Sequence, residues 1–115
     1  AQNIGATDII TGVHTGGDYM YPDTSDTFIN ALRFALQVGS GSPIRIIAPL
    51  QNKGKREIWE LAESLGAVNF CIEHTLSCYN GSLKKNDFGF GCGECLSCKL
   101  RKEGYQDYVS NNKDN

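Results

Sequence analysis

Four of the five cysteines in this sequence have the spacing of metal ligands. Cys92, Cys95 and Cys98 are each separated from the next by two residues, and Cys78 precedes them with 13 residues between. Two residues between cysteines let the backbone curl around one ion, so that neighbouring sulfurs reach it from a single turn. The spacing Cys-x13-Cys-x2-Cys-x2-Cys therefore predicts a metal site with four thiolate ligands.

The surroundings of these cysteines favour the same site. Gly91 and Gly93 permit a close approach of the backbone to an ion, and Asn80-Gly81 predicts a turn that leads the chain from Cys78 back toward the cluster. Ordinary thiols and disulfides are the alternatives. An odd number of cysteines, with no signal peptide at the N-terminus, indicates a reducing cytoplasmic location in which disulfides are rare.

The ion expected at these cysteines is zinc. Four thiolates close the coordination shell of Zn²⁺, and closed sites of this kind are structural rather than catalytic. An iron–sulfur cluster is the rival, because ferredoxins share the spacing, but Lys102 stands where the fourth ferredoxin ligand would be. Cys71 is expected to be a small buried hydrophobic residue, and His74 a surface or hydrogen-bonded one.

Composition and charge limit the classes of function. The 115 residues are 40% hydrophobic and 21% charged, which is enough apolar material for a folded domain. A formal net charge of −2 gives no support to broad electrostatic binding of nucleic acid or of acidic membranes. No apolar run approaches the roughly 20 residues of a membrane span.

Hydrophobic patterning predicts strands that alternate with helices. The predicted strands are residues 8–13, 44–50 and 68–74, and the predicted helices are residues 25–38, 55–65 and a short basic helix at 99–106. Trp59 is expected in the core, and a polar hairpin-like stretch precedes the cysteines. This order predicts an α/β fold with a mostly parallel sheet. Two or three strands are few for such a sheet, and the chain has no initiator Met, so we expect part of the sheet to lie elsewhere.

Several segments resemble the C-terminal half of the 7-cyano-7-deazaguanine synthase family, whose members make preQ0 in queuosine biosynthesis. The segments are TGV, YPD with a following phenylalanine, APLQNKGKREIWELAE, HTLSCYNG and GCGECLSCKLR. The resemblance runs from about Ile4 to Tyr108, and the cysteine block is its most specific part.

The resemblance implies a fold and a division of the chain. Family members have the doubly wound parallel sheet of the ATP-pyrophosphatase group, which is adenine nucleotide alpha-hydrolase-like, and a C-terminal four-cysteine knuckle with structural Zn²⁺. We therefore expect residues 1–70 to belong to the nucleotide-binding domain and residues 71–108 to form a zinc-binding subdomain. Residues 109–115 are expected to form a disordered tail.

The resemblance also implies an ATP-dependent carbon–nitrogen ligase. Family members use ATP with Mg²⁺ to adenylate the carboxylate of 7-carboxy-7-deazaguanine, ammonia attacks, and the resulting amide is activated and dehydrated to the nitrile. A carboxylate is a poor electrophile, and adenylation gives it a good leaving group. The expected partners are these small molecules and a second copy of the full-length protein in a homodimer. Membrane and nucleic-acid partners are not expected.

Lys55 matches the family's lysine in the segment NKGKREIW. A lysine at a helix N-terminus can bind nucleotide phosphates together with free backbone N–H groups. The resemblance therefore favours phosphate binding by Lys55 over a solvated lysine, with Lys53 as the neighbouring competitor. Glu57 is expected either to orient Lys55 or to favour the first turn of the helix.

The segment YPD lies in the loop after a predicted strand, where open α/β sheets bind ligands. The resemblance implies that Asp23, together with Tyr21, accepts hydrogen bonds from the deazaguanine; a helix N-cap is the equal alternative for Asp23. Gly12 is expected to let the backbone approach the nucleotide, or simply to end a strand. His14 is expected to be a loop residue near this site.

The sequence departs from the family pattern in two places. The Ser-Gly-Gly-x-Asp-Ser phosphate loop of the family does not occur in these residues, so this chain alone is not expected to catalyse the reaction. Thr24 and Ser25 stand where the family has Cys-Arg, which removes a partner for the substrate carboxylate. Two other interpretations remain open: a divergent paralogue that acts on another carboxylate, and a zinc-stabilised module that binds RNA or protein through KLRK.

Overall fold

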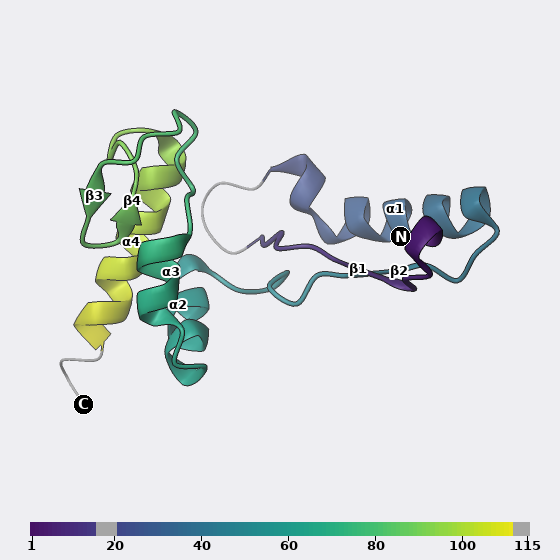
Figure 1. Cartoon of the computed structure of the whole chain (residues 1–115), viewed down its shortest axis with the longest axis horizontal. Coiled ribbons are helices and arrows are strands. Elements are labelled where there is room, and N and C mark those ends of the chain that lie inside the picture. The colour runs from purple at the N-terminus through teal and green to yellow at the C-terminus, as the bar shows by residue number, and fades with distance from the viewer. Residues whose placement is uncertain (16–20, 112–115) are drawn as a thin grey trace. The chain divides into compact units, whose positions relative to one another are not determined.

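The computed structural model describes residues 1–15 and 21–111 of the chain (Figure 1). The chain separates into two compact units, Ala1–Lys53 and Gly54–Asn115. The expected boundary at residue 70 refers to functional domains and stays a prediction. Within the described part of the chain, no helix combines the length and the apolar character needed to cross a membrane.

The first unit is built around a strand–helix–strand arrangement. Strand β1 (Asp8–Ile10) pairs in parallel with strand β2 (Arg45–Ile47), with Ile9 opposite Ile46. Helix α1 (Asp26–Ser40) connects them, and two short 3-10 helices, η1 (Gln2–Ile4) and η2 (Pro22–Thr24), complete the unit. The expected α/β class with a parallel sheet is confirmed, although both strands are shorter than predicted.

Local sequence signals set the ends of α1. The Ser25 hydroxyl accepts a hydrogen bond from the Phe28 N–H at 3.2 Å, so Ser25 is the N-cap. Gly41 follows the helix with φ of 59°, a left-handed conformation that glycine adopts at little cost. Ile29 is the buried residue of α1, and the Arg33 guanidinium donates to the carbonyl of Ile46 at 2.7 Å, which ties the helix to β2.

The second unit is mainly helical. Its elements are α2 (Lys55–Ser64), α3 (Val68–His74), a hairpin of β3 (Lys85–Asn86) and β4 (Gly89–Phe90), and α4 (Leu96–Asn111). Helices α2 and α4 pack against each other (Figure 1). The ring of Trp59 contacts Tyr105 at 5.0 Å and Tyr108 at 6.4 Å between centroids, which confirms its expected place in the core.

The prediction of a strand over residues 68–74 is wrong, because this segment forms helix α3. Its inward side chains are Val68, Cys71 and Ile72, whereas Asn69 and Glu73 are exposed. This spacing of three and four residues matches a helix and not the alternation of a strand. Strand-favouring residue types therefore misled the prediction, since Asn69 and Glu73 fit the alternation of a strand as well as the spacing of a helix.

The C-terminal helix is longer than expected. Helix α4 begins at Leu96, inside the cysteine cluster, and continues to Asn111. It therefore includes residues 109–111, which were expected to belong to a disordered tail, while residues 112–115 lie outside the described residues. The extra length adds Cys98 and Tyr108 to a buried face of α4 that also contains Arg101 and Gly104.

Candidate functional site

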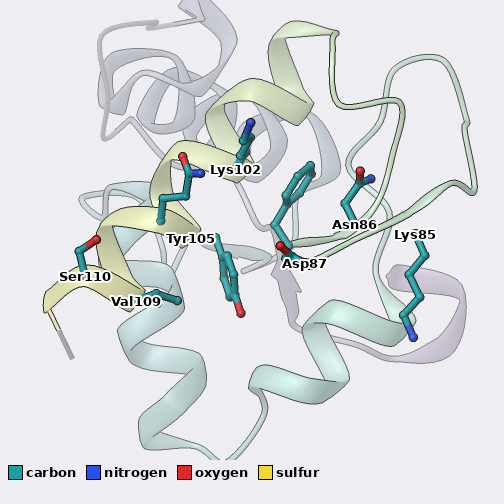
Figure 2. Close-up of a pocket in the computed structure, with 9 residues that line it drawn as sticks. Lys85, Asn86, Asp87, Lys102, Tyr105, Val109 and Ser110 are labelled. Atoms are coloured by element: carbon teal, nitrogen blue, oxygen red, sulfur yellow. The ribbon is translucent and has the colours of Figure 1, made fainter. Parts of the chain in front are cut away.

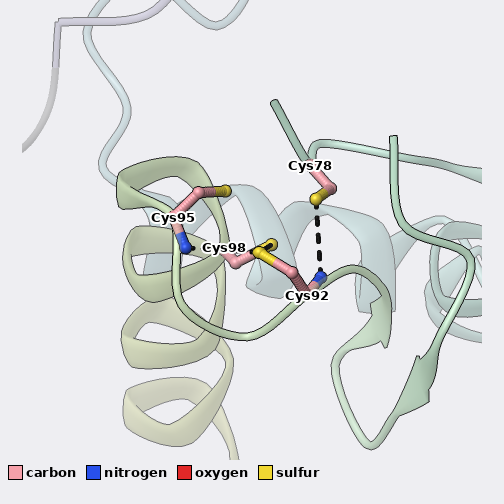
Figure 3. Close-up of side chains that lie close together, drawn as sticks. All are labelled: Cys78, Cys92, Cys95 and Cys98. Atoms are coloured by element: carbon pink, nitrogen blue, oxygen red, sulfur yellow. Dashed lines mark hydrogen bonds between the residues drawn. The ribbon is translucent and has the colours of Figure 1, made fainter. Parts of the chain in front are cut away.

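Strand-like pairing brings the distant cysteine to the cluster. Leu76 forms an isolated parallel bridge with Phe90. Because the two segments run in the same direction, residues two positions further along, Cys78 and Cys92, also lie side by side. The backbone N–H of Cys92 donates to the Cys78 sulfur at 3.4 Å (Figure 3).

A tight turn then carries the remaining two sulfurs to the same place. Gly93 has φ of 80°, and the N–H groups of Glu94 and Cys95 both donate to the Cys92 sulfur, at 3.4 and 3.3 Å. Helix α4 begins directly after this turn and carries Cys98 in its first turn. The two-residue spacing of the cysteines is thus realised as a loop that curls around its own sulfurs.

Glycine is required at position 91 for the site to close. A Cβ atom there would lie 2.6 Å from the Cys98 sulfur, which is too close for any side chain. On the other side of the site, Gly81 has φ of 63° and its N–H donates to the Cys78 carbonyl at 3.1 Å, which forms the expected turn after Cys78. These contacts agree with the close backbone approach expected from the sequence.

The four sulfurs fit a single metal ion. Those of Cys78, Cys92, Cys95 and Cys98 all lie within 4.8 Å of one another, and the group could hold a metal ion. The Cys92 and Cys98 sulfurs are 3.9 Å apart. A tetrahedral ion with metal–sulfur bonds of about 2.3 Å holds its sulfurs about 3.8 Å apart. In a four-iron cluster each sulfur binds a different iron, so such closely spaced sulfurs favour one ion.

The four thiols do not share one electrostatic environment. The Cys92 N–H, with those of Ser82 and Asn80, lowers the pKa of Cys78 to about 6 against the cost of burial. N–H groups of Cys98 and Tyr79 lower the pKa of Cys95. Burial has the opposite effect on Cys98 and raises its pKa to about 12. The N–H donors favour thiolates, the form in which cysteine binds metal.

Neither Cys71 nor His74 belongs to the group of four sulfurs. Cys71 is half-buried on α3, less buried than expected, and its carbonyl accepts hydrogen bonds from the Arg101 guanidinium and the Thr75 hydroxyl. His74 is an exposed residue at the end of α3, with its ring 5.1 Å from that of Phe70, as expected for a surface residue.

Lys55 is the first residue of helix α2, as expected. Its side chain is half-buried, and burial, with the nearby Arg101 guanidinium, lowers the pKa of its ammonium group. Among the described residues no carboxylate pairs with it. Glu57 instead accepts a hydrogen bond from the Gly54 N–H at 2.7 Å, so Glu57 caps the helix and leaves Lys55 unneutralised.

The structure separates the two interpretations of Asp23. Ser25 caps α1, and Asp23 is an exposed residue of η2. Tyr21 begins the same turn, and its carbonyl accepts from the Thr24 N–H and hydroxyl at 3.0 and 2.9 Å. Gly12 lies beyond β1, and a Cβ atom there would meet none of the described residues within 4 Å. These residues belong to the first unit and Lys55 to the second, so their grouping into one site stays a prediction.

Gln51 connects the segments that follow the two strands, and the sequence analysis missed it. It is 8% exposed, its amide N–H₂ donates to the Thr24 carbonyl, and its own carbonyl accepts from Thr15 N–H at 2.8 Å and Thr15 hydroxyl at 2.7 Å. A glutamine directly after the predicted strand 44–50, in APLQ, was the available signal. Gln51 fixes the turn that carries Asp23 at the carboxyl ends of the parallel strands.

A separate pocket of about 740 Å³ lies between the β3–β4 hairpin and α4 (Figure 2). Lys102, Tyr105, Val109 and Ser110 line it from the helix, and the hairpin supplies residues 85–88. Its lining contains none of the four clustered cysteines and none of the residues predicted to bind nucleotide. The pocket is therefore distinct from both sites.

The fold and the cysteines define a class: an α/β protein with a parallel sheet and a four-cysteine centre that could hold a metal ion. The family model of the queuosine biosynthesis protein QueC matches residues 1–109. The chain belongs to the QueC family, which confirms the family expected from the sequence. Membership implies the nucleotide alpha-hydrolase fold of the ATP-pyrophosphatase group.

Named relatives agree with the family model. The chain is 40% identical over 114 residues to the 7-cyano-7-deazaguanine synthase of Helicobacter pylori (strain Shi470), an alignment that covers 98% of this chain and 50% of that protein. It is 42% identical over 114 residues to the protein of the same name from Lysinibacillus sphaericus (strain C3-41), covering 99% and 50%. The chain spans about half the length of the curated relatives it matches.

Proposed function

We propose that this chain is part of a 7-cyano-7-deazaguanine synthase. The complete enzyme would adenylate 7-carboxy-7-deazaguanine with ATP and Mg²⁺ and let ammonia displace AMP, and the resulting amide would then be activated and dehydrated to the nitrile preQ0. The observation that carries the proposal is the QueC match over residues 1–109, which includes all four clustered cysteines. Because the phosphate loop of the family does not occur in these residues, activity requires the polypeptide that supplies it.

Within this function, Lys55 would bind the phosphates of ATP. Three observations support that role: its position at the start of α2, its partial burial, and its lack of a carboxylate partner in the part of the chain that the structure describes. A half-buried cation beside a second cation, Arg101, is unfavourable on its own and gains from an anionic ligand. Backbone N–H groups at the helix N-terminus would add to the attraction.

Asp23 and Tyr21 would bind the deazaguanine, and Gly12 would let the backbone approach the nucleotide. The Asp23 carboxylate is exposed and does not cap α1, so it is available to accept hydrogen bonds from ring and amino N–H groups of the deazaguanine. None of the described residues would exclude a side chain at Gly12, so packing against them does not require glycine there. A ligand that contacts the backbone would account for it.

The ion at the four cysteines would be Zn²⁺ with a structural role. All four ligand positions are protein sulfurs, which leaves no open position for chemistry, and a borderline ion such as zinc suits thiolates. When bound, zinc would lock the segment after α3 to the start of α4. Elemental analysis should find one zinc per chain, and a brown protein that contains iron would contradict this assignment.

Substitution of Lys55 tests the nucleotide site. In the full-length protein, given 7-carboxy-7-deazaguanine, ATP, Mg²⁺ and ammonia, Lys55→Ala should raise the KM for ATP about tenfold or more, since it removes a charged hydrogen-bond donor. Lys53→Ala is the matched control, because Lys53 is also a half-buried lysine and lies just before the helix, and it should change the KM for ATP less than about threefold. Product is followed as the nitrile by mass spectrometry. Equal effects of the two variants would contradict the role of Lys55.

The same assay tests the alternatives. A wild-type protein that adenylates a different carboxylate and makes no preQ0 would indicate a divergent paralogue. Thr24 and Ser25 are the reason to test for a paralogue. Thr24 shapes the η2 turn and Ser25 caps α1, and neither supplies a cation for the substrate carboxylate. The RNA-binding alternative loses support, because Arg101 of the KLRK segment is buried and its guanidinium is occupied by contacts within the chain.

A further inference from the structure

Arg101 is a buried cation at the centre of the second unit. It is 6% exposed and lies three residues after Cys98 on α4. Its guanidinium donates to the carbonyls of Phe88 at 2.8 Å and Cys71 at 2.7 Å, and to the hydroxyls of Thr75 at 2.9 Å and Ser77 at 3.1 Å. Four of its N–H directions are thus filled by acceptors from three separate segments.

These segments lead to the cysteines. Cys71 is on α3, Thr75 and Ser77 belong to the connection that ends at Cys78, and Phe88 is in the turn of the hairpin that ends shortly before Cys92. Arg101 itself is one helical turn beyond Cys98. The guanidinium therefore ties three segments together. They are the connection that leads to Cys78, the hairpin that leads to Cys92, and helix α4, which carries Cys98.

The charge of Arg101 also needs an explanation. All four acceptors are neutral, and in the described ranges no carboxylate forms an ion pair with it. The face of Trp59, 5.4 Å from the guanidinium carbon, offers a partial counterpart. A buried cation without a full counter-charge is costly. A divalent ion bound by four thiolates carries a net charge of −2, and Cys98 brings such a centre within one turn of Arg101.

We propose that Arg101 is the positioning residue of the metal centre: it holds the Cys78 connection and the hairpin against α4 so that the four sulfurs meet, and it offsets the negative charge of the loaded site. Outer residues that orient metal ligands contribute strongly to affinity, and their loss commonly weakens binding about 10- to 100-fold. The planar fork matters here, because a lysine could keep the charge but could not reach acceptors in three segments at once.

The test is the affinity of this chain for Zn²⁺, measured by competition with a chromophoric chelator. Arg101→Lys should weaken binding about tenfold or more, and Arg101→Gln further, because it also removes the charge. Lys102→Gln is the matched control: it removes an exposed charge from the neighbouring position of α4 and should change affinity less than about twofold. Co²⁺ spectra of each variant report the geometry of the site.

A second measurement separates positioning from general stability. Unfolding in urea is followed with and without zinc; loss of positioning lowers the stability of the loaded form more than that of the metal-free form, since only the former contains the site. If Arg101 variants do not fold, Ser77→Ala and Thr75→Val remove single acceptors and should each weaken zinc binding about threefold, the effect of one modest hydrogen bond.

The outcomes are distinct for the inference and for the zinc centre on which it rests. If Arg101→Lys binds zinc with wild-type affinity, the role of Arg101 is overturned and the zinc centre stays in place. If Arg101→Lys is unfolded, wild-type affinity in both acceptor variants has the same meaning. A wild-type chain that takes up no zinc would overturn both. Weakened binding with an unchanged Lys102→Gln control would support the inference.

Discussion

At the scale of single residues, the four clustered cysteines show how backbone geometry separates chemically identical groups. Cys78 accepts N–H donors and has a lowered pKa, whereas Cys98 is enclosed and has a raised one. The sequence spacing predicted that the four sulfurs lie together, and the structure agrees: a local turn gathers Cys92, Cys95 and Cys98, and strand-like pairing adds Cys78. The sequence could not predict the structural roles of Arg101 and Gln51, because their hydrogen-bond acceptors are distant in the chain. The acceptors of Arg101 lie 13 to 30 positions away, and the acceptor of the Gln51 amide lies 27 positions away.

These pKa values predict how zinc binding depends on pH. At pH 7 Cys78, with a pKa of about 6, is already mostly ionised in the folded chain, whereas Cys98, with a pKa of about 12, holds its proton. Zinc must displace the proton of Cys98, whereas Cys78 has almost no proton left to lose. Uptake of one zinc at pH 7 should therefore release fewer than four protons, and zinc affinity should rise with pH. Calorimetry in buffers of different ionisation enthalpy measures the release.

The same pKa values predict in which direction the stability of the metal-free chain changes with pH. The lowered pKa of Cys78 contributes stability above its unfolded value of about 9, and this contribution is lost as the pH falls through about 6. The raised pKa of Cys98 acts in the opposite direction: folding is penalised as the pH rises from about 9 toward 12. A metal-free chain whose stability against urea does not rise between pH 6 and pH 9 would contradict the role of Cys78, and zinc affinity that is constant over the same range would contradict the binding prediction.

At the scale of elements, patterning predicted α1, α2, the two strands and the hairpin, because each has a local signal in its spacing or its turns. It failed for α3, where Val68, Phe70 and Ile72 suggested a strand. The preference of a residue type for strands is worth less than about 1 kcal/mol. The packing of a complete helical face outweighs it.

The contact between α2 and α4 supplies the next prediction. A Cβ atom on Gly104 would lie 2.3 Å from the Lys55 Cβ and 2.9 Å from the Lys55 carbonyl carbon, which is backbone and cannot move aside. Gly104→Ala should gain about 0.5–1 kcal/mol of helix propensity. It should lose about 1–3 kcal/mol to overpacking, so the chain should be destabilised.

Unfolding in urea, followed by far-UV circular dichroism and by the fluorescence of Trp59, measures this effect. Gly39→Ala in α1 is the matched control, because a Cβ there meets nothing within 4 Å, and it should be neutral or slightly stabilising. A Gly104→Ala variant as stable as wild type would show that α2 and α4 can separate without loss. Since Lys55 begins α2, the shifted helix should also weaken ATP binding in the full-length protein.

At the scale of the whole molecule, the first unit exposes apolar surface that a parallel sheet normally buries. Ile10 on β1 is 72% exposed and Phe34 on α1 is 69% exposed, and among residues 1–15 and 21–111 no third strand pairs with either edge of this sheet. Parallel sheets in α/β proteins are covered on both faces. The relatives are about twice as long as this chain, so we expect polypeptide outside the matched half to cover this sheet and complete the doubly wound fold.

Hydrogen exchange tests that expectation. In this chain alone, amides of β1 and β2 should exchange faster than those in the middle of α4, because the strands have few buried side chains above them and open more readily. In the full-length protein, hydrogen exchange of the β1 and β2 amides should slow by a larger factor than exchange of the α4 amides. Helix α4 is already packed against α2 and anchored by the buried Cys98 in this chain alone. Equal slowing in both elements would mean that the added polypeptide stabilises the chain without covering the sheet. The exposed isoleucines would then need another partner, and the sheet would not continue into the rest of the protein.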